Sequence, residues 1–246
     1  MDAALLTVGD ELLDGDTENT NATWLAGELT DRGVDVRRIL VVPDEVAVIA
    51  DIVADYAETY DAVVVTGGLG GTPDDVTLDG VSAAFDRPMV VHEEARVAVE
   101  ETLEAYLEER PDLDIDVDID AEAALPEGGR PIDNPAGLSP GCVIENVYVL
   151  PGIPGEMKAT FGTIAEAFHG DIVSRFRYTT EPEANMVGTL TAVRDRFDVM
   201  VGCYPDRDAG HNRLKISATE QTALENAIAY LSERIDVVTD PAELEA

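Results

Sequence analysis

Apolar and polar positions follow two different periods along the first half of the chain. Short continuous apolar runs predict strands, at residues 3–8, 34–42 and 61–67. Elsewhere apolar residues recur every three or four positions, a spacing that places them on one face of a helix. The helices predicted in this way span residues 20–32, 44–60, 77–85 and 92–109. This alternation indicates a doubly wound, mostly parallel α/β sheet, which binds ligands at the carboxyl ends of its strands.

The second half of the chain is organised differently. Turn-forming residues dominate 111–141, strand character then resumes with a turn at Glu145 and Asn146, and a helix is predicted at about 154–168. After about residue 170 a small unit follows, with the predicted order strand, helix, strand, strand, helix. We therefore expect two domains, at residues 1–170 and 171–246.

A glycine-rich loop, TGGLGGTPDDVT at residues 66–77, directly follows the third predicted strand. It lacks the Gly-Lys-Ser/Thr ending of a P-loop and the third glycine of the dinucleotide-binding fingerprint. Glycines after a buried strand nevertheless let backbone amides approach a ligand closely. Asp74 and Asp75 fall where the next helix begins, so they either cap that helix or hold Mg²⁺ together with phosphate oxygens. The sequence leaves both roles open.

Polar residues also follow other strands. Asp10 and Glu11 come directly after the first strand, and Asn21 lies at the start of the next helix. Asp44 follows the second strand, and Glu156 follows the strand that ends near residue 150. Because the carboxyl ends of parallel strands meet at one edge of a sheet, we expect these side chains to converge on the glycine-rich loop.

Charge sets this chain apart from an average protein. It holds 51 acidic residues against 16 basic ones, a formal net charge of −35, and its only lysines are Lys158 and Lys215. The acidic residues are scattered along the chain, a pattern that indicates adaptation to molar salt, where their mutual repulsion is screened. This charge argues against nucleic acid as a partner, since nucleic-acid binding needs a basic surface.

The apolar runs predict neither a membrane span nor a secretory signal. They are too short to cross a bilayer, and no basic region precedes the first of them. We therefore expect a cytoplasmic protein with no membrane partner. Cys142 and Cys203 lack metal-ligand spacing and are expected to be small apolar core residues.

Five motifs carry a resemblance to a known family. They read VGDELLDGDTENTNATWLAGEL, VVPDEVAVI, DAVVVTGGLGGTPDDVT, LPEGGRPIDNPAGLSPG and VLPGIPGEM, in that order along the chain. Together they resemble the molybdopterin-binding, MoaB/Mog-like domain in the form found in CinA-type (competence/damage-inducible) proteins. The segment VGCYPDR and the small unit around it look like the second domain of that family, which has KH-like topology.

The resemblance implies a fold, an assembly and an activity. The fold would be a three-layer MoaB/Mog-like α/β domain followed by a small α+β, KH-like domain, and such proteins frequently form homo-oligomers. A pocket at Gly67, Gly68, Asp74 and Asp75 would face a pterin or nucleotide ligand carrying phosphate. CinA-type proteins are associated with divalent-metal-dependent cleavage of ADP-ribose at its pyrophosphate, a related domain with FAD hydrolysis, and the molybdopterin enzymes with adenylylation of molybdopterin.

The predicted site follows from these motifs. Asp74 and Asp75 would hold a divalent metal (Mg²⁺, Mn²⁺ or Co²⁺) and would be catalytic together with Asp44; Asp10, Glu11 or Asp44 would complete the metal site or act as general base. Molybdopterin is the alternative ligand. The residues expected to bind substrate are Gly9, Asp10, Glu11, Asn21, Thr66, Gly67, Gly68, Leu69, Gly70, Thr77, Pro151, Gly152 and Glu156.

Three functions stay open on the sequence alone. The leading hypothesis is a metal-dependent pyrophosphatase of ADP-ribose or a related nucleotide diphosphate. The second is binding or adenylylation of molybdopterin in molybdenum cofactor biosynthesis, and the third is a nucleotide-binding module without catalysis. Two departures from the family pattern favour the third: Gly71 stands where relatives hold proline, and Ala121 and Glu122 stand where a basic residue is common. Longer relatives carry an amidase domain without a counterpart in this sequence, so no amidase activity is expected.

Overall fold

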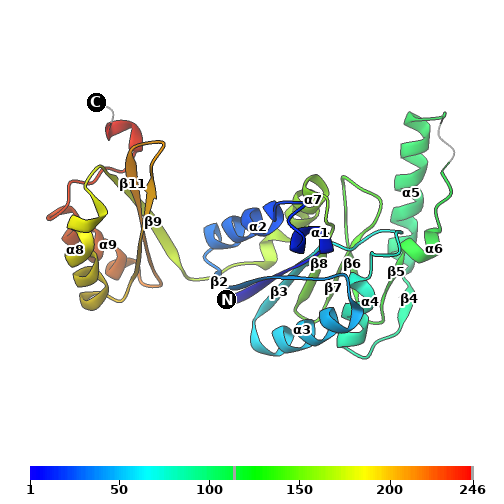
Figure 1. Ribbon diagram of the computed structural model, residues 1–246. Helices are drawn as coiled ribbons and strands as arrows, with labels where there is room; N and C mark the ends of the chain where they lie inside the picture. Colours follow the sequence, from blue (N-terminus) through cyan, green and yellow to red (C-terminus); the bar gives the residue numbers. More distant parts are fainter. Residues whose placement is uncertain (113–114, 245–246) are drawn as a thin grey trace. The chain divides into compact units, whose positions relative to one another are not determined.

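A six-stranded sheet forms the centre of the first half of the protein. The computed structural model describes residues 1–112 and 115–244 (Figure 1). The strand order is β2-β1-β3-β8-β7-β6, and β2, β1, β3 and β8 run parallel whereas β7 and β6 are antiparallel to their neighbours. The strands are β1 (Asp2–Val8), β2 (Asp35–Val42), β3 (Ala62–Thr66), β6 (Arg130–Ile132), β7 (Gly141–Ile144) and β8 (Val147–Leu150). The predicted, mostly parallel α/β sheet is confirmed.

Helices cover both faces of this sheet. Figure 1 shows α3 (Val46–Thr59) and α4 (Thr77–Ala84) beneath the sheet, and α2 (Thr20–Asp31) and α7 (Pro154–Ile164) above it. On the lower face, apolar residues of α3 and α4 form one fully buried core cluster with residues of β1 and β3. On the upper face, the Trp24 ring meets the Phe161 ring edge to face at 5.6 Å. The domain therefore has the three layers expected of a MoaB/Mog-like fold.

The segment expected to consist of turns contains short regular elements. Strand β4 (Met89–Val91) pairs with β5 (Ala124–Pro126) in a separate two-stranded sheet. Helix α5 (Glu93–Glu109) and a one-turn helix α6 (Ile119–Glu122) lie between these two strands along the chain. The helix predicted to reach residue 168 ends at Ile164 and continues as a 3-10 turn, η1 (Ala165–Ala167). Elements of three or four residues are too short to show a period in the sequence.

The second compact unit comprises residues 30–34 and 170–246, and residues 1–29 and 35–169 form the first. The elements of the second unit are β9 (Val173–Thr179), α8 (Glu183–Arg196), β10 (Met200–Asp206), β11 (His211–Ala218), α9 (Gln221–Ser232) and the 3-10 turn η2 (Pro241–Leu244). The three strands form an antiparallel sheet in the order β10-β11-β9, and both helices pack on it through a core that includes Met186, Leu214 and Leu231. The order of elements is the one predicted.

None of the helices in the described part of the chain is both long and apolar enough to cross a bilayer. The cysteines behave as predicted. Cys142 is fully buried in the first core, where burial raises the pKa of its thiol to about 12, and Cys203 packs against the core of the second unit.

Candidate functional site

The glycine-rich loop leaves the sheet at the carboxyl end of β3 in a left-handed conformation. Gly67 has φ +104° and Gly68 has φ +59°, and a side chain at Gly67 would collide with the carbonyl oxygen of Val8. The first turn of α4 holds the loop in place, because Thr77 donates its hydroxyl to the Gly67 carbonyl (2.8 Å) and its N–H to the Gly68 carbonyl (3.2 Å). Glycine is therefore required here by the backbone conformation and by the close approach of β1.

The next four residues present their backbone amides to no protein partner. Within residues 1–112 and 115–244, no oxygen accepts a hydrogen bond from the N–H of Gly68, Leu69, Gly70 or Gly71. Consecutive amides that follow left-handed residues form a concave cluster of donors, which binds phosphate and other anions. The loop therefore offers an anion site at the carboxyl edge of the sheet.

Four carboxylates gather around this loop. Asp44 accepts a hydrogen bond on Oδ2 from the backbone N–H of Asp10 (2.8 Å). Partial burial raises the pKa of Asp44, and the nearby charges of Asp10, Asp74 and Asp75 raise it further, against the lowering effect of the Asp10 bond. The pKa of Asp74, in contrast, is lowered, mainly by a hydrogen bond from Thr72. A carboxylate whose pKa is raised by burial and by like charges, as that of Asp44 is, is typical of functional sites.

Asp75 belongs to the loop rather than to the following helix. Its Oδ2 accepts hydrogen bonds from the backbone N–H (3.0 Å) and the hydroxyl (2.6 Å) of Thr72, and a side chain at Gly70 would lie 2.7 Å from the same oxygen. Helix α4 begins at Thr77 without any side-chain cap. The alternative that Asp74 or Asp75 caps this helix is therefore wrong, because the hydrogen bonds of Asp75 close the preceding turn instead.

A second strand end supports the loop from below. Thr66 donates its hydroxyl to the Pro151 carbonyl (2.7 Å), and Asn21 donates its amide to the Gly152 carbonyl (2.7 Å). The other amide atom of Asn21, Oδ1, is buried without a hydrogen-bond partner in the described residues. The structure thus brings these four predicted residues into one network, and it leaves one buried acceptor at the site unsatisfied.

The remaining predicted residues at the first strand end form the rim. Gly9 is buried and donates its N–H to the Val42 carbonyl (3.1 Å). Asp10 and Glu11 begin the short helix α1 (Asp10–Leu13), and both are exposed. Asp10 therefore joins the carboxylate group through Asp44, whereas the carboxylate of the exposed Glu11 lies beside Gly9.

Two residues that sequence reasoning left out of the site also reach the loop. A small cavity lies between Gly68, Gly70 and Asp75 on one side and Glu122 and Ser139 on the other. The Ser139 hydroxyl donates to Glu122 Oε2 (2.6 Å), and Glu122 lies so close to Gly71 that a side chain there would be 3.0 Å from Glu122 Oε1. The only signal in the sequence was the motif LPEGGRPIDNPAGLSPG, beside which Glu122 was noted as a departure from the family.

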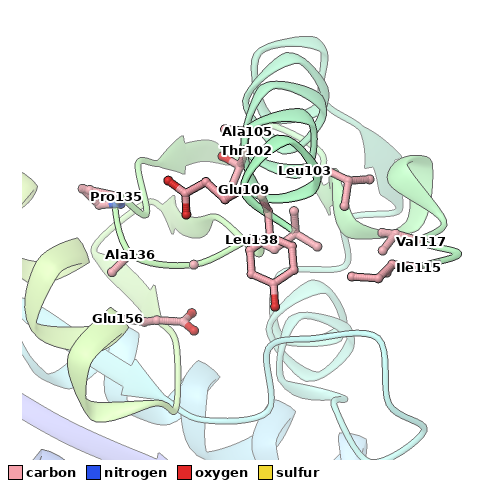
Figure 2. A pocket seen from close by; sticks show the side chains of 12 residues that line it. Thr102, Leu103, Ala105, Glu109, Ile115, Val117, Pro135, Ala136, Leu138 and Glu156 are labelled. Carbon is pink, nitrogen blue, oxygen red and sulfur yellow. The ribbon is translucent and has the colours of Figure 1, made fainter. Parts of the chain in front are cut away.

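Glu156 lies in a second, larger cavity. This cavity of about 490 Å³ lies between α5 and residues 135–138, and Figure 2 shows the Glu156 side chain directed into it. Glu156 Oε2 accepts a hydrogen bond from the side-chain amide of Asn134 (3.0 Å). The structure therefore places Glu156 on a different cavity from the four aspartates at the glycine-rich loop.

The predicted metal can be tested against this donor set. In the described residues, no three His, Cys, Asp or Glu side chains are grouped so as to hold a metal ion by themselves. Mg²⁺, however, usually binds through one or two carboxylates together with waters and substrate phosphate oxygens. Asp75 has one carboxylate oxygen, Oδ2, already bonded to Thr72, and Asp74 is exposed, so a metal at these two residues stays a prediction that depends on a phosphate ligand.

Comparison with known proteins agrees with this architecture. Residues 4–169 match the family described as probable molybdopterin binding domain. A protein of Archaeoglobus fulgidus is 34% identical over 238 residues, which cover 96% of this chain and 99% of that protein. Protein TK1472 of Thermococcus kodakarensis is 33% identical and covers 95% of this chain and 97% of its own. The crystal structure of CinA from Thermoplasma acidophilum, described as a protein of unknown function, superimposes with a TM-score of 0.60 at 32% identity, over 69% of this chain and 99% of that chain.

The layered sheet and the glycine-rich loop at its carboxyl edge define an α/β protein of the MoaB/Mog-like class. The chain belongs to the molybdopterin-binding domain family, in its CinA-like form. The Thermoplasma structure accounts for about two thirds of the chain, whereas the two archaeal relatives extend over nearly all of it.

Proposed function

We propose that the protein is a divalent-metal-dependent pyrophosphatase that cleaves ADP-ribose or a related nucleotide diphosphate. The observation that carries this proposal is the row of four unpaired amides at Gly68–Gly71 beside a group of carboxylates. Amides alone suit any phosphate ligand. The carboxylates beside them add the means to position a metal, and Asp44, whose pKa is raised, adds a group that can accept a proton.

The lining of the loop cavity supports a requirement for a cation. Neither Lys nor Arg is among its residues, and Asp75 and Glu122 both contribute carboxylates. A diphosphate placed there would meet negative charge on several sides. A divalent ion, when bound, would offset that repulsion, polarise the phosphoryl group and lower the pKa of a bound water. We therefore expect no turnover in the presence of a chelator.

The residues around the loop have different roles in the proposed reaction. The amides of Gly68–Gly71 bind the oxygens of the attacked phosphate and stabilise the charge that develops on them. Asp74 and Asp75 supply carboxylate ligands for the ion. Asp44, whose pKa is raised, takes the proton of the attacking water. The new bond joins the water oxygen to phosphorus, the bridging P–O bond breaks, and AMP and ribose 5-phosphate leave.

The test is a product analysis at high salt. ADP-ribose is incubated with the protein and Mg²⁺, Mn²⁺ or Co²⁺, and the nucleotides are separated by chromatography. Formation of AMP and ribose 5-phosphate, abolished by EDTA, is the expected result. Intact ADP-ribose with all three metals would contradict the proposal, and measurable binding without turnover would instead favour a nucleotide-binding module.

Molybdopterin chemistry is the second candidate, favoured by the family match over residues 4–169. Adenylylation would use the same loop for the phosphates of ATP. Incubation with ATP and molybdopterin, followed by mass spectrometry of the pterin, distinguishes the two reactions: an adenylylated pterin would replace the pyrophosphatase assignment.

A further inference from the structure

The large cavity beside the site has the size and lining of a ligand pocket. Its volume of about 490 Å³ falls within the usual range for small-molecule sites. Its apolar lining includes Leu103 and Tyr106 of α5, together with Ile115, Val117 and Leu138. Figure 2 shows Leu103, Val117 and Ile115 close together at one side of the cavity. We infer that this cavity binds the base of the nucleotide, and that Glu156 selects bases carrying an amino group over uracil. The inference rests on the proposed function, because the phosphates are taken to lie at the glycine-rich loop.

One segment of the chain joins the two cavities. Gly137 and Leu138 line the large cavity, and the next two residues, Ser139 and Pro140, line the small cavity against the glycine-rich loop. Since consecutive Cα atoms are only about 3.8 Å apart, the two cavities adjoin one another along this segment. We place the phosphate of the ligand at the loop amides and its base in the large cavity, with this segment bordering both.

The walls of the large cavity suit a flat aromatic ring. Tyr106 is 40% exposed and Ile115 is 37% exposed, although both are largely apolar. The Arg110 guanidinium lies 5.1 Å from the centroid of the Tyr106 ring, so the ring is supported by a cation–π contact. Bases stack on aromatic side chains through a π-face that every base possesses. These apolar walls explain affinity for a base but give no preference between bases.

Glu156 supplies the preference. One of its carboxylate oxygens, Oε2, accepts from Asn134, and no protein donor in the described residues is bonded to the other, Oε1. An ionised carboxylate only accepts hydrogen bonds, so the group facing it must donate. Adenine, guanine and pterin rings all carry an amino group, whereas uracil has carbonyl oxygens on both sides of its N–H. Thr102, Tyr106 and Glu109 carry the other polar side-chain groups of the cavity, and Glu109 also only accepts when ionised.

The experiment measures binding without turnover. AMP and UMP are titrated into the full chain by calorimetry, in molar KCl with Mg²⁺. We expect the wild type to bind AMP at least about tenfold more tightly than UMP, a discrimination that one hydrogen bond with a charged partner can supply. Glu156→Gln should lose most of this preference, because a glutamine amide both donates and accepts yet can still accept from Asn134. Tyr106→Ala should weaken both ligands alike.

Matched controls separate these effects from folding and from general charge. Glu108 is exposed and precedes the cavity residue Glu109 in the chain but does not line the cavity. Glu108→Gln should therefore leave the affinities for AMP and UMP unchanged. Equal affinity of the wild type for AMP and UMP, or an unchanged preference in a folded Glu156→Gln variant, would overturn the inference. A Glu156-dependent preference for AMP without ADP-ribose hydrolysis would contradict only the proposed reaction, and hydrolysis without that preference would contradict only the base site.

Discussion

At the scale of single residues, the fold holds several carboxylates near one another although their negative charges repel. Asp44 is bonded to the backbone of Asp10 and senses the charges of Asp74 and Asp75. Asp75 is fixed over Gly70 by its two bonds from Thr72. These two aspartates therefore carry different predictions, one for turnover and one for stability.

Replacing Asp75 should abolish metal-dependent turnover. In Asp75→Asn the amide oxygen can still accept from Thr72, so the loop stays closed, but the charge that binds the metal is lost. We expect hydrolysis of ADP-ribose to fall by at least about 100-fold, the scale on which a group that stabilises the transition state acts. Asp79→Asn, at an exposed position of α4, is the matched control. Full activity in Asp75→Asn would remove Asp75 from the mechanism.

Replacing Asp44 should stabilise the protein at neutral pH. The folded state raises the pKa of Asp44 above its ordinary value of 3.8, so the charged side chain opposes folding once the pH exceeds the folded pKa. Asp44→Asn removes this cost, and we expect a gain of about 0.2–1 kcal/mol at low salt without metal, the range of an exposed charge pair. The gain should vanish as the pH falls below 3.8.

Urea unfolding across this pH range measures the gain. Glu45→Gln, next in the chain and exposed, should show no such pH-dependent difference. A loss of stability in Asp44→Asn at neutral pH would show that the Asp10 bond outweighs the repulsion.

At the scale of elements, the junction between β3, the loop and α4 positions the amides. Thr77 is fully buried, and its hydroxyl and N–H bind two successive carbonyls of the loop. This pairing explains why the helix needs no side-chain cap: its first residue is tied directly to the strand end. The loop and the helix therefore form one unit.

Substitution of Thr77 tests this junction. Thr77→Val keeps the shape of the side chain but leaves the Gly67 carbonyl without its hydroxyl partner, and we expect a loss of about 1–3 kcal/mol in the free energy of unfolding. Thr77→Ser keeps the hydroxyl and should retain most of the stability. Thermal unfolding followed by circular dichroism compares the two, and equal melting temperatures would show that the bond is dispensable.

The long elements of the fold were predictable, and the short ones were not. The valine run of β3 and the helical spacing of α3 show a clear period, whereas β4 and β5 have three residues each and depend on pairing across 32 intervening residues. Likewise, the convergence of Asp10, Asp44 and Asp75 followed from the rule for parallel strand ends. The bond between Ser139 and Glu122 and the separate cavity of Glu156 depend on how loops fold in space, which no local pattern encodes.

At the scale of the whole molecule, the net negative charge is the main feature that bears on stability. A net charge of −35 on 246 residues opposes the compact state through self-repulsion. Arg37, Arg96 and Arg234 form ion pairs with neighbouring carboxylates. With 16 basic residues against 51 acidic ones, however, ion pairs can neutralise only a minority of the carboxylates. Dissolved salt must therefore supply most of the screening.

Stability should accordingly rise with salt. The Debye length falls from about 10 Å at 0.1 M to about 3 Å at 1 M, which removes most repulsion between surface carboxylates. We expect the melting temperature to rise by about 5–10 °C between these concentrations of KCl, equivalent to a few kcal/mol for a chain of this size. Differential scanning calorimetry measures the shift. A melting temperature that is independent of KCl would contradict adaptation to high salt.

Amide NMR shows whether the amides of Gly68–Gly71 hold the phosphate of a nucleotide. AMP is titrated into ¹⁵N-labelled protein with Mg²⁺ at high salt, and the backbone amide shifts are followed. We expect Gly68, Leu69, Gly70 and Gly71 to show the largest shifts, and Thr77→Ser to preserve them. Saturable AMP binding that leaves these four amides unshifted would place the phosphate elsewhere and contradict the proposed phosphate site.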